Sequence, residues 1–419
     1  MINYNRATKY LEKKNYAKAI QFYKRQLKEL EFKECYLNMG NSYRGMGDLN
    51  EALKCYLKAN SAEVTFSNGD RGSYDFALGN LGLLEYTHGN DDAAIAFYTA
   101  ALELNPLHFD SIWNYSSALL RKCCSFESND FAAAWKMYEY RFKRNGPTPI
   151  DTTIPRWDGV SSGKSIVVLA EQGMGDKFMW GRYLYHLKQK FETVWVQCPK
   201  QMYEIFSNYR TCMLVSETDA EVSVPFCSLA MYFPNSRSTW LEKAFEARDF
   251  GPGMHIGIEW AGSTTHANDV NRSCLPTHFQ QLAKYGKLYN MRPDAAPVKG
   301  VISLNPSGWK ETAEIVNGLD LIISVDTSVV HLAGSLGRPC WMLQPLLETD
   351  FRWGNDSMGE SNIWYPSVSV IRNPGSWERT FAKVMAKLEL NRLIDWRRHF
   401  EDKIGFMYDD MVSERHLDV

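Results

Sequence analysis

The clearest alternation of apolar and polar positions lies near residue 330. An apolar run over 319–325 ends in the polar turn Asp326 to Ser328, and further apolar runs cover 329–336 and 340–343. This order predicts a strand, a turn, a helix and a second strand, which is the repeating unit of a parallel α/β sheet. Polar groups that follow such a strand lie at the carboxyl edge of the sheet, where open parallel sheets bind ligands.

The same pattern continues on both sides of this segment and predicts two separate α/β sheets. Six strands are expected in the second sheet, over 255–260, 287–291, 301–304, 319–325, 340–343 and 367–371. The first sheet is expected from strands at 165–170, 193–198, 213–216 and 228–233, with an amphipathic helix over 177–190. Terminal helices are expected from Trp377 to about Arg398. Two such domains, facing each other, form a cleft between their strand ends, which is a common place for a ligand.

The first part of the chain has a different, helical pattern that repeats. Small residues recur in similar contexts at Ala19, Ala52, Ala94 and Ala134, with spacings of 33, 42 and 40 residues. The tetratricopeptide period is about 34, so the first spacing fits and the later two indicate insertions. The chain therefore resembles a tetratricopeptide array of three to four units. We expect either a concave face for a partner or a stabilising extension of the next domain.

Proline and glycine between 146 and 155 mark a linker. The pattern of strands begins again near residue 252, after a second group of glycine and proline. These breaks predict a repeat domain over 1–145, a first Rossmann-like domain over 146–252 and a second over 253–419.

Composition narrows the classes of function. The 47 basic and 49 acidic residues nearly balance, so net charge does not favour nucleic acid or an anionic membrane as partner. The polar N-terminus and the lack of an 18-residue apolar run predict a cytoplasmic chain without a membrane span. The nine cysteines show no metal-ligand spacing, so neither a metal nor a cofactor is expected.

A glycine turn follows the first strand of the first sheet. Gly173 and Gly175 bracket Met174, and Asp176 comes next, at the expected start of a helix. Asp176 is either a helix-capping carboxylate or a general base aimed across the cleft. From spacing alone, capping is favoured.

Several candidate ligand-binding residues follow the first and fourth strands of the second sheet. Arg272 offers a rigid fork for phosphate, and Thr327 and Ser328 open a helix whose N–H groups suit an anion. The loop residues Trp260 and Asn268 precede Arg272. The alternative is a solvent-exposed loop and a simple helix cap.

Two more candidates are less specific. His331 lies one turn into the helix that Ser328 opens, and a lone histidine in an apolar run is more often a core residue. Aromatic clusters at 350–354 and 364–366 could shape a sugar or base pocket, or close the edge of the cleft.

Taken together, these segments resemble bacterial tetratricopeptide proteins fused to a glycosyltransferase domain. The catalytic part is similar to the heptosyltransferases and, more distantly, to O-GlcNAc transferases. The resemblance rests on seven motifs in the family's order: AAWKMYEYRF (133–142), PRWDG (155–159), EQGMGDKFMWGRYL (171–184), GIEWAGSTTHANDVNRS (257–273), LDLIISVDTSVVHLAGSLGRPCW (319–341), DFRWG (350–354) and WYPS (364–367).

The resemblance implies a GT-B fold, in which two Rossmann-like domains hold a nucleotide-sugar donor, mainly on the second. It also implies metal-independent inverting transfer, with Asp176 as the base. The donor-binding residues that it implies, or that lie beside its motifs, are Gly175, Trp260, Asn268, Arg272, Arg292, Asp326, Thr327, Ser328, His331 and Gly334. Family members often carry glutamine near the position of Arg292, so phosphate contacts or donor choice are expected to differ there.

The expected function is thus transfer of a sugar from a nucleotide sugar to a hydroxyl of a protein or glycan. The alternatives are a non-catalytic tetratricopeptide scaffold or nucleotide-sugar-binding protein, and a glycosyltransferase that modifies a nucleobase. Nucleic acid is disfavoured by the neutral charge balance.

Overall fold

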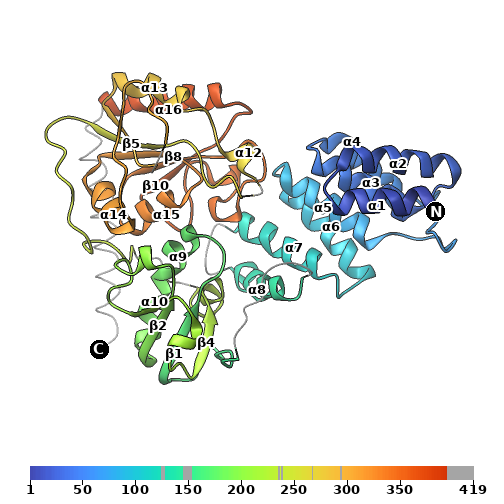
Figure 1. The fold of residues 1–419 in the computed structure, drawn as a ribbon, viewed down its shortest axis with the longest axis horizontal. Coiled ribbons are helices and arrows are strands. Elements are labelled where there is room, and N and C mark those ends of the chain that lie inside the picture. The colour runs from blue at the N-terminus through green and yellow to red at the C-terminus, as the bar shows by residue number, and fades with distance from the viewer. Residues whose placement is uncertain are drawn as a thin grey trace. The chain divides into compact units, whose positions relative to one another are not determined.

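A computed structural model describes residues 1–123, 128–144, 153–234, 236, 239–266, 268–292 and 295–393, with only the backbone for 391–393. These residues form two compact units (Figure 1). Unit 1 comprises 1–149 and the short segment 347–355, and unit 2 comprises 150–346 and 356–419. The expected end of the terminal helices near Arg398 lies outside the described residues.

Unit 1 contains four successive helix pairs in its described part. Their bounds are α1 Ile2–Glu12, α2 Tyr16–Glu29, α3 Lys33–Gly45, α4 Leu49–Asn60, α5 Asp75–Thr87, α6 Asp91–Leu104, α7 Phe109–Lys122 and α8 Asn129–Tyr138. The four recurring alanines are fully buried, which explains their small size. The longer spacing between Ala52 and Ala94 is explained by the connection between α4 and α5, which runs from residue 61 to residue 74.

The glycines of the repeats allow paired helices to approach closely. A Cβ atom on Gly40 would lie 2.6 Å from the Tyr56 ring, and one on Gly82 would lie 2.6 Å from the Tyr98 ring. Because the same glycine–tyrosine contact occurs in two successive pairs, the repeat is structural as well as sequential.

The segment Leu347–Asn355, which we call the inserted segment, completes the core of unit 1. The Phe351 ring lies 6.0 Å from that of Trp135 and 5.7 Å from that of Tyr138, both on α8. Arg121 on α7 donates to the Thr349 carbonyl at 2.9 Å. Within the 350–354 cluster, the Phe351 side chain is therefore used in packing inside unit 1.

Unit 2 contains a four-stranded and a six-stranded sheet, and all the recorded strand pairs are parallel. The smaller has the order β3-β2-β1-β4, with β1 Gly163–Leu169, β2 Phe191–Gln197, β3 Arg210–Cys212 and β4 Val222–Pro225. Its described helices are α9 Met174–Trp180, α10 Leu184–Lys188 and α11 Leu229–Tyr232.

Three sequence predictions for this sheet are wrong. The expected strand at 213–216 is a bend followed by a 3-10 turn, and the nearby strand is β3. The expected strand at 228–233 is instead the short helix α11, because a short buried apolar run has the same composition in either structure. The expected helix over 177–190 is divided by a 3-10 turn at Gly181–Tyr183. A Cβ atom on Gly181 would lie 2.3 Å from the Trp240 ring, so a tertiary contact accompanies the break.

The larger sheet has all six predicted strands. They are β5 His255–Glu259, β6 Lys287–Asn290, β7 Val301–Ser303, β8 Leu321–Val325, β9 Cys340–Leu343 and β10 Val368–Ile371, in the order β10-β9-β8-β5-β6-β7. Its helices are α12 Asp269–Arg272, α13 Thr277–Gln280, α14 Trp309–Gly318, α15 Ser328–Ser335 and α16 Trp377–Leu393. In Figure 1, α13 and α16 lie on one side of the sheet and α14 and α15 on the other.

The strand order identifies the fold. Numbered along the chain, the strands of the larger sheet run 3-2-1-4-5-6, and those of the smaller run 3-2-1-4. Both are doubly wound Rossmann orders, in which the connections reverse direction between the first and fourth strands. The predicted class, helical repeats followed by two Rossmann-like sheets, is confirmed.

Candidate functional site

The switch point of the larger sheet lies between β5 and β8, which pair directly. Ligands of open α/β sheets bind beyond the carboxyl ends of the strands at such a reversal. Here β5 leads into Trp260–Ser263, which we call the first-strand loop, and β8 leads into Asp326 and α15.

Arg272 connects these two strand ends. Its Nη1 donates to the Asp326 carbonyl at 3.1 Å and its Nη2 to the Ser263 carbonyl at 3.3 Å. Its Nε lies 3.3 Å from the Asp269 carboxylate, and the residue is only 9% exposed. A buried guanidinium at a switch point provides a fixed positive charge beside the ligand position.

The N-terminus of α15 adds N–H donors at the same place. Thr327 is the N-cap, but its Oγ1 lies 3.0 Å from the Ser324 hydroxyl and does not cap the helix. Within the described residues, the amides of Ser328 and Val329 have no recorded hydrogen-bond acceptor, whereas Val330 donates to the Thr327 carbonyl. Uncapped amides and the helix dipole together favour an anion.

Asn268 and Trp260 support Arg272 in different ways. The Asn268 carbonyl accepts from the Arg272 amide at 3.2 Å, and its side chain accepts from Asn271 at 2.6 Å. The Trp260 indole packs in the hydrophobic core of the larger sheet and is only 8% exposed. Both residues therefore hold the loop around the switch point.

Gly175, His331 and Gly334 lie where α9, α15 and Tyr365 pack together. A Cβ atom on Gly175 would lie 2.7 Å from His331 Cδ2, and one on Gly334 would lie 2.3 Å from the Tyr365 ring. His331 Nδ1 lies 3.1 Å from the Tyr365 hydroxyl. The two glycines therefore allow close packing at this place, and His331 and Tyr365 share a hydrogen bond.

Asp176 is the third residue of α9, the helix that packs on α15. Its Oδ2 accepts a hydrogen bond from the Gly173 amide at 2.9 Å, which is the capping role favoured by its spacing. The candidate base and the candidate anion site are therefore on neighbouring helices of unit 2.

Arg292 is turned toward the backbone. Its Nη1 donates to the Ala261 carbonyl at 2.5 Å and to the Gly262 carbonyl at 3.2 Å. The same nitrogen lies 3.7 Å from a carboxylate oxygen of Glu259.

The sequence reasoning missed Glu259, the last residue of β5. Its side chain is buried, and burial raises the pKa of its carboxyl to about 8, although Arg292 acts in the opposite direction. The 3.7 Å separation is too long for a hydrogen bond, which explains why burial dominates. A glutamate that ends the apolar strand HIGIE was the available signal.

We expect Glu259 to make folding stability depend on pH. Between about pH 4.5 and 8 the unfolded chain gives up a proton that the folded chain keeps, so stability falls as pH rises across this window. The free energy of unfolding should fall by an amount on the order of a few kcal/mol across this window. Glu259→Gln should therefore raise the melting temperature at pH 8 and change it little at pH 5.

Melting curves at both pH values test this, with exposed Glu192→Gln as the control that should keep the wild-type pH dependence. If Glu259→Gln changed the melting temperature equally at pH 5 and pH 8, Glu259 would not be the group whose titration lowers stability.

Lys177 is a second buried charge that the sequence did not reveal. Its ammonium donates to the Gly173 carbonyl at 3.3 Å, and the residue is 4% exposed. Burial lowers its pKa, while the neighbouring Asp176 carboxylate opposes that shift.

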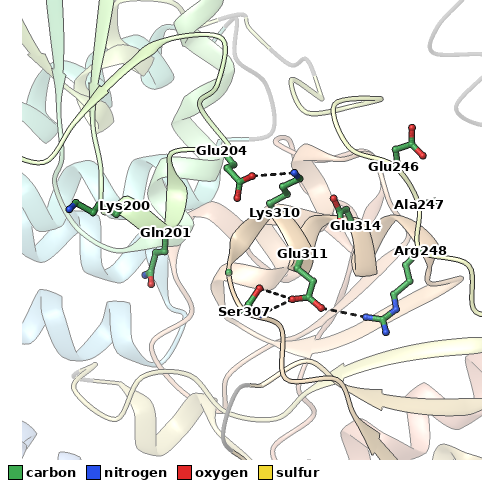
Figure 2. A pocket seen from close by; sticks show the side chains of 11 residues that line it. Lys200, Gln201, Glu204, Glu246, Ala247, Arg248, Ser307, Lys310, Glu311 and Glu314 are labelled. Carbon is green, nitrogen blue, oxygen red and sulfur yellow. Dashed lines mark hydrogen bonds and ion pairs between the residues drawn. The ribbon is translucent and has the colours of Figure 1, made fainter.

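A charged cleft of about 690 Å³ lies elsewhere in unit 2 and contains none of the predicted site residues. Figure 2 shows Lys310 directed toward Glu204 and Glu311 directed toward Arg248. The Lys310–Glu204 distance is 3.2 Å and the Arg248–Glu311 distance is 3.6 Å. Ion pairs between such exposed side chains contribute little to stability.

Two further properties concern metal binding and membrane insertion. Among the described residues, no group of three or more His, Cys, Asp or Glu side chains is arranged to hold a metal ion. In the same part of the chain, no helix combines the length and apolar character needed to cross a bilayer.

Comparison with known proteins confirms the repeats. A family model for the tetratricopeptide repeat matches residues 34–106. Protein FlbA of Caulobacter vibrioides is 23% identical over 321 residues, which are 61% of this chain and 52% of that protein. The chain thus spans about half the length of the curated relative that it matches.

Several of the solved structures that are similar to this chain are glycosyltransferases. An O-GlcNAc transferase variant from Thermobaculum terrenum covers 99% of this chain and 96% of its own, with 13% identity and a TM-score of 0.33. The E. coli heptosyltransferase WaaC, with ADP-2-deoxy-2-fluoro heptose, covers 54% of this chain and 99% of its own, with 13% identity and a TM-score of 0.38. At these low scores, the chemistry of this chain has to be inferred from its own residues.

Proposed function

We propose that this protein is a glycosyltransferase that moves a sugar from a nucleotide sugar to an acceptor hydroxyl, with inversion and without a metal. The observation that carries the proposal is the joint position of Arg272 and the uncapped start of α15 at the β5–β8 switch point. This pair suits a diphosphate, because one group supplies a fixed cation and the other supplies N–H donors.

The same groups would favour departure of the nucleoside diphosphate. As the bond between the anomeric carbon and the diphosphate oxygen breaks, negative charge grows on the leaving group. Arg272 and the amides of Ser328 and Val329 stabilise that charge in fixed positions, which lowers the barrier. This is the contribution that a divalent cation makes in metal-dependent transferases.

Asp176 is the proposed base. It removes the proton of the acceptor hydroxyl while that oxygen attacks the anomeric carbon, so one C–O bond forms as the other breaks. The motif resemblance supports this role, as does the packing of α9 on α15, the helix whose start we propose as the diphosphate site. A single displacement of this kind inverts the anomeric centre.

We propose a protein or glycan as the acceptor, because a tetratricopeptide array offers an extended surface for a macromolecule. The near balance of charges over the chain gives no support for nucleic acid.

Nucleotide binding provides the direct test. In a thermal-shift panel of UDP, GDP, ADP and CMP sugars, run with EDTA present, one nucleotide class should stabilise the wild type. A ligand at a hundred times its Kd contributes about 2.7 kcal/mol. Arg272→Ala should abolish this shift.

The outcomes separate the candidate functions. If a nucleotide sugar raised the melting temperature of the wild type and of Arg272→Ala alike, Arg272 would not be part of the site. A rise that requires added metal would contradict metal independence. The absence of a shift with every donor would favour the scaffold function.

A further inference from the structure

The first-strand loop is held by a hydrogen bond at each of its four carbonyl groups. The Trp260 carbonyl accepts from the Cys274 amide at 2.9 Å, and the Ser263 carbonyl accepts from Arg272. The two carbonyls between them both accept from Arg292 Nη1. Two arginines therefore hold three of the four carbonyls of a loop that lies at the switch point.

Among the described residues, Glu259 is the only acidic residue recorded within 4 Å of the Arg292 guanidinium. Its carboxyl group is buried at the end of β5, one residue before the loop begins. Its oxygen lies 3.7 Å from the nitrogen that binds the two carbonyls. Three oxygen atoms of the same strand end thus surround Arg292 Nη1, and this limits where the guanidinium can lie.

Gly262, in the first-strand loop, is in direct contact with the Arg272 side chain. A Cβ atom on Gly262 would lie 2.3 Å from Arg272 Nη2, so the guanidinium lies directly against the glycine backbone. The Gly262 amide also donates to the Ser273 hydroxyl at 3.3 Å, next to Arg272 in the chain. A shift of Gly262 would therefore move the guanidinium or leave it unsupported.

We propose that Arg292 is a positioning residue that fixes the first-strand loop, with the buried side chain of Glu259 beside it, and so sets the position of Arg272. Its effect on the donor diphosphate passes through Arg272 and not through a direct contact. This inference rests on the proposed function for its ligand, but its structural part concerns the ligand-free protein.

Hydrogen exchange of the ligand-free protein tests the structural part. Amides within 260–275 should exchange about tenfold faster in Arg292→Ala, because the loop loses two carbonyl anchors. Arg248→Ala is the matched control, since its 3.6 Å ion pair with Glu311 is similar in length but belongs to the charged cleft. Unchanged exchange in Arg292→Ala would overturn the proposal, whatever the protein binds.

A double-mutant cycle on nucleotide affinity tests the route of the effect. With UDP, GDP and ADP as probes, Arg292→Ala should weaken binding of the preferred nucleotide about tenfold. Arg272→Ala should weaken it more, and the double variant should bind no more weakly than Arg272→Ala alone. Arg292→Lys should recover only part of the loss, because a lysine lacks the planar fork.

Additive losses in the double variant would show that Arg292 contacts the ligand itself and would overturn the positioning role. If the wild type binds none of the three nucleotides, the proposed donor site fails. Faster exchange in Arg292→Ala would then still support Arg292 as the anchor of the loop, and unchanged exchange would remove that role too.

Discussion

Asp176→Asn should lower turnover by about 10²- to 10⁴-fold while nucleotide affinity stays within about twofold, because general-base catalysis is lost and the diphosphate contacts are untouched. Asparagine keeps a side-chain oxygen that can accept from the Gly173 amide, so the start of α9 should survive the change. Measured kcat and nucleotide Kd for the wild type and the variant check this expectation.

Glu217→Gln is the matched control for this change. Glu217 also accepts from the backbone at the start of a helical turn, with the Met213 amide at 2.8 Å and the Leu214 amide at 3.2 Å. Its conversion to an amide should leave turnover unchanged. Full activity of Asp176→Asn would exclude Asp176 as the base, and equal losses in both variants would point to a structural cause.

Arg121→Ala should destabilise unit 1 by about 3–5 kcal/mol, which is the usual cost of removing one partner of a buried ion pair. The guanidinium donates to Asp91 at 2.6 and 2.8 Å, and both side chains are almost fully buried. It also donates to the carbonyls of Tyr86 and Thr349 and stacks on the Tyr86 ring. Hydrogen exchange of the α7 amides in the full chain measures the loss.

The adjacent residue supplies the control. Lys122 pairs with Asp92, next to Asp91, but both side chains are exposed, so Lys122→Ala should cost no more than about 1 kcal/mol. Removing Asp91 together with Arg121 should cost less than the sum of the single changes, because no charge is then left buried and unpaired. Similar losses for Arg121→Ala and Lys122→Ala would refute the role of the buried pair.

The sequence predicted the elements whose signal is local. The six strands of the larger sheet are apolar runs bounded by turn residues, and all six are present. Asp326, Thr327 and Ser328 directly follow β8, as strand order predicts, and Arg272 reaches the Asp326 carbonyl from the end of α12.

The features that escaped prediction depend on side-chain direction or on distant contacts. Nothing near Arg292 in the sequence shows that its guanidinium turns back to Ala261 and Gly262. Likewise, the packing of Phe351 against Trp135 joins positions far apart in the chain. A pattern of apolar and polar residues does not specify partners at that separation.

The inserted segment also determines how the repeat array can grow. A solenoid needs a terminal cap, because its last repeat has no neighbour to cover its inner face. Here Phe351 covers Trp135 and Tyr138 of α8, so the C-terminal end of the array is already closed by residues that belong to no repeat. A repeat added after α8 would have to displace this cap, whereas one added before α1 would not. Lengthening of the array in related chains is therefore expected at its N-terminal end.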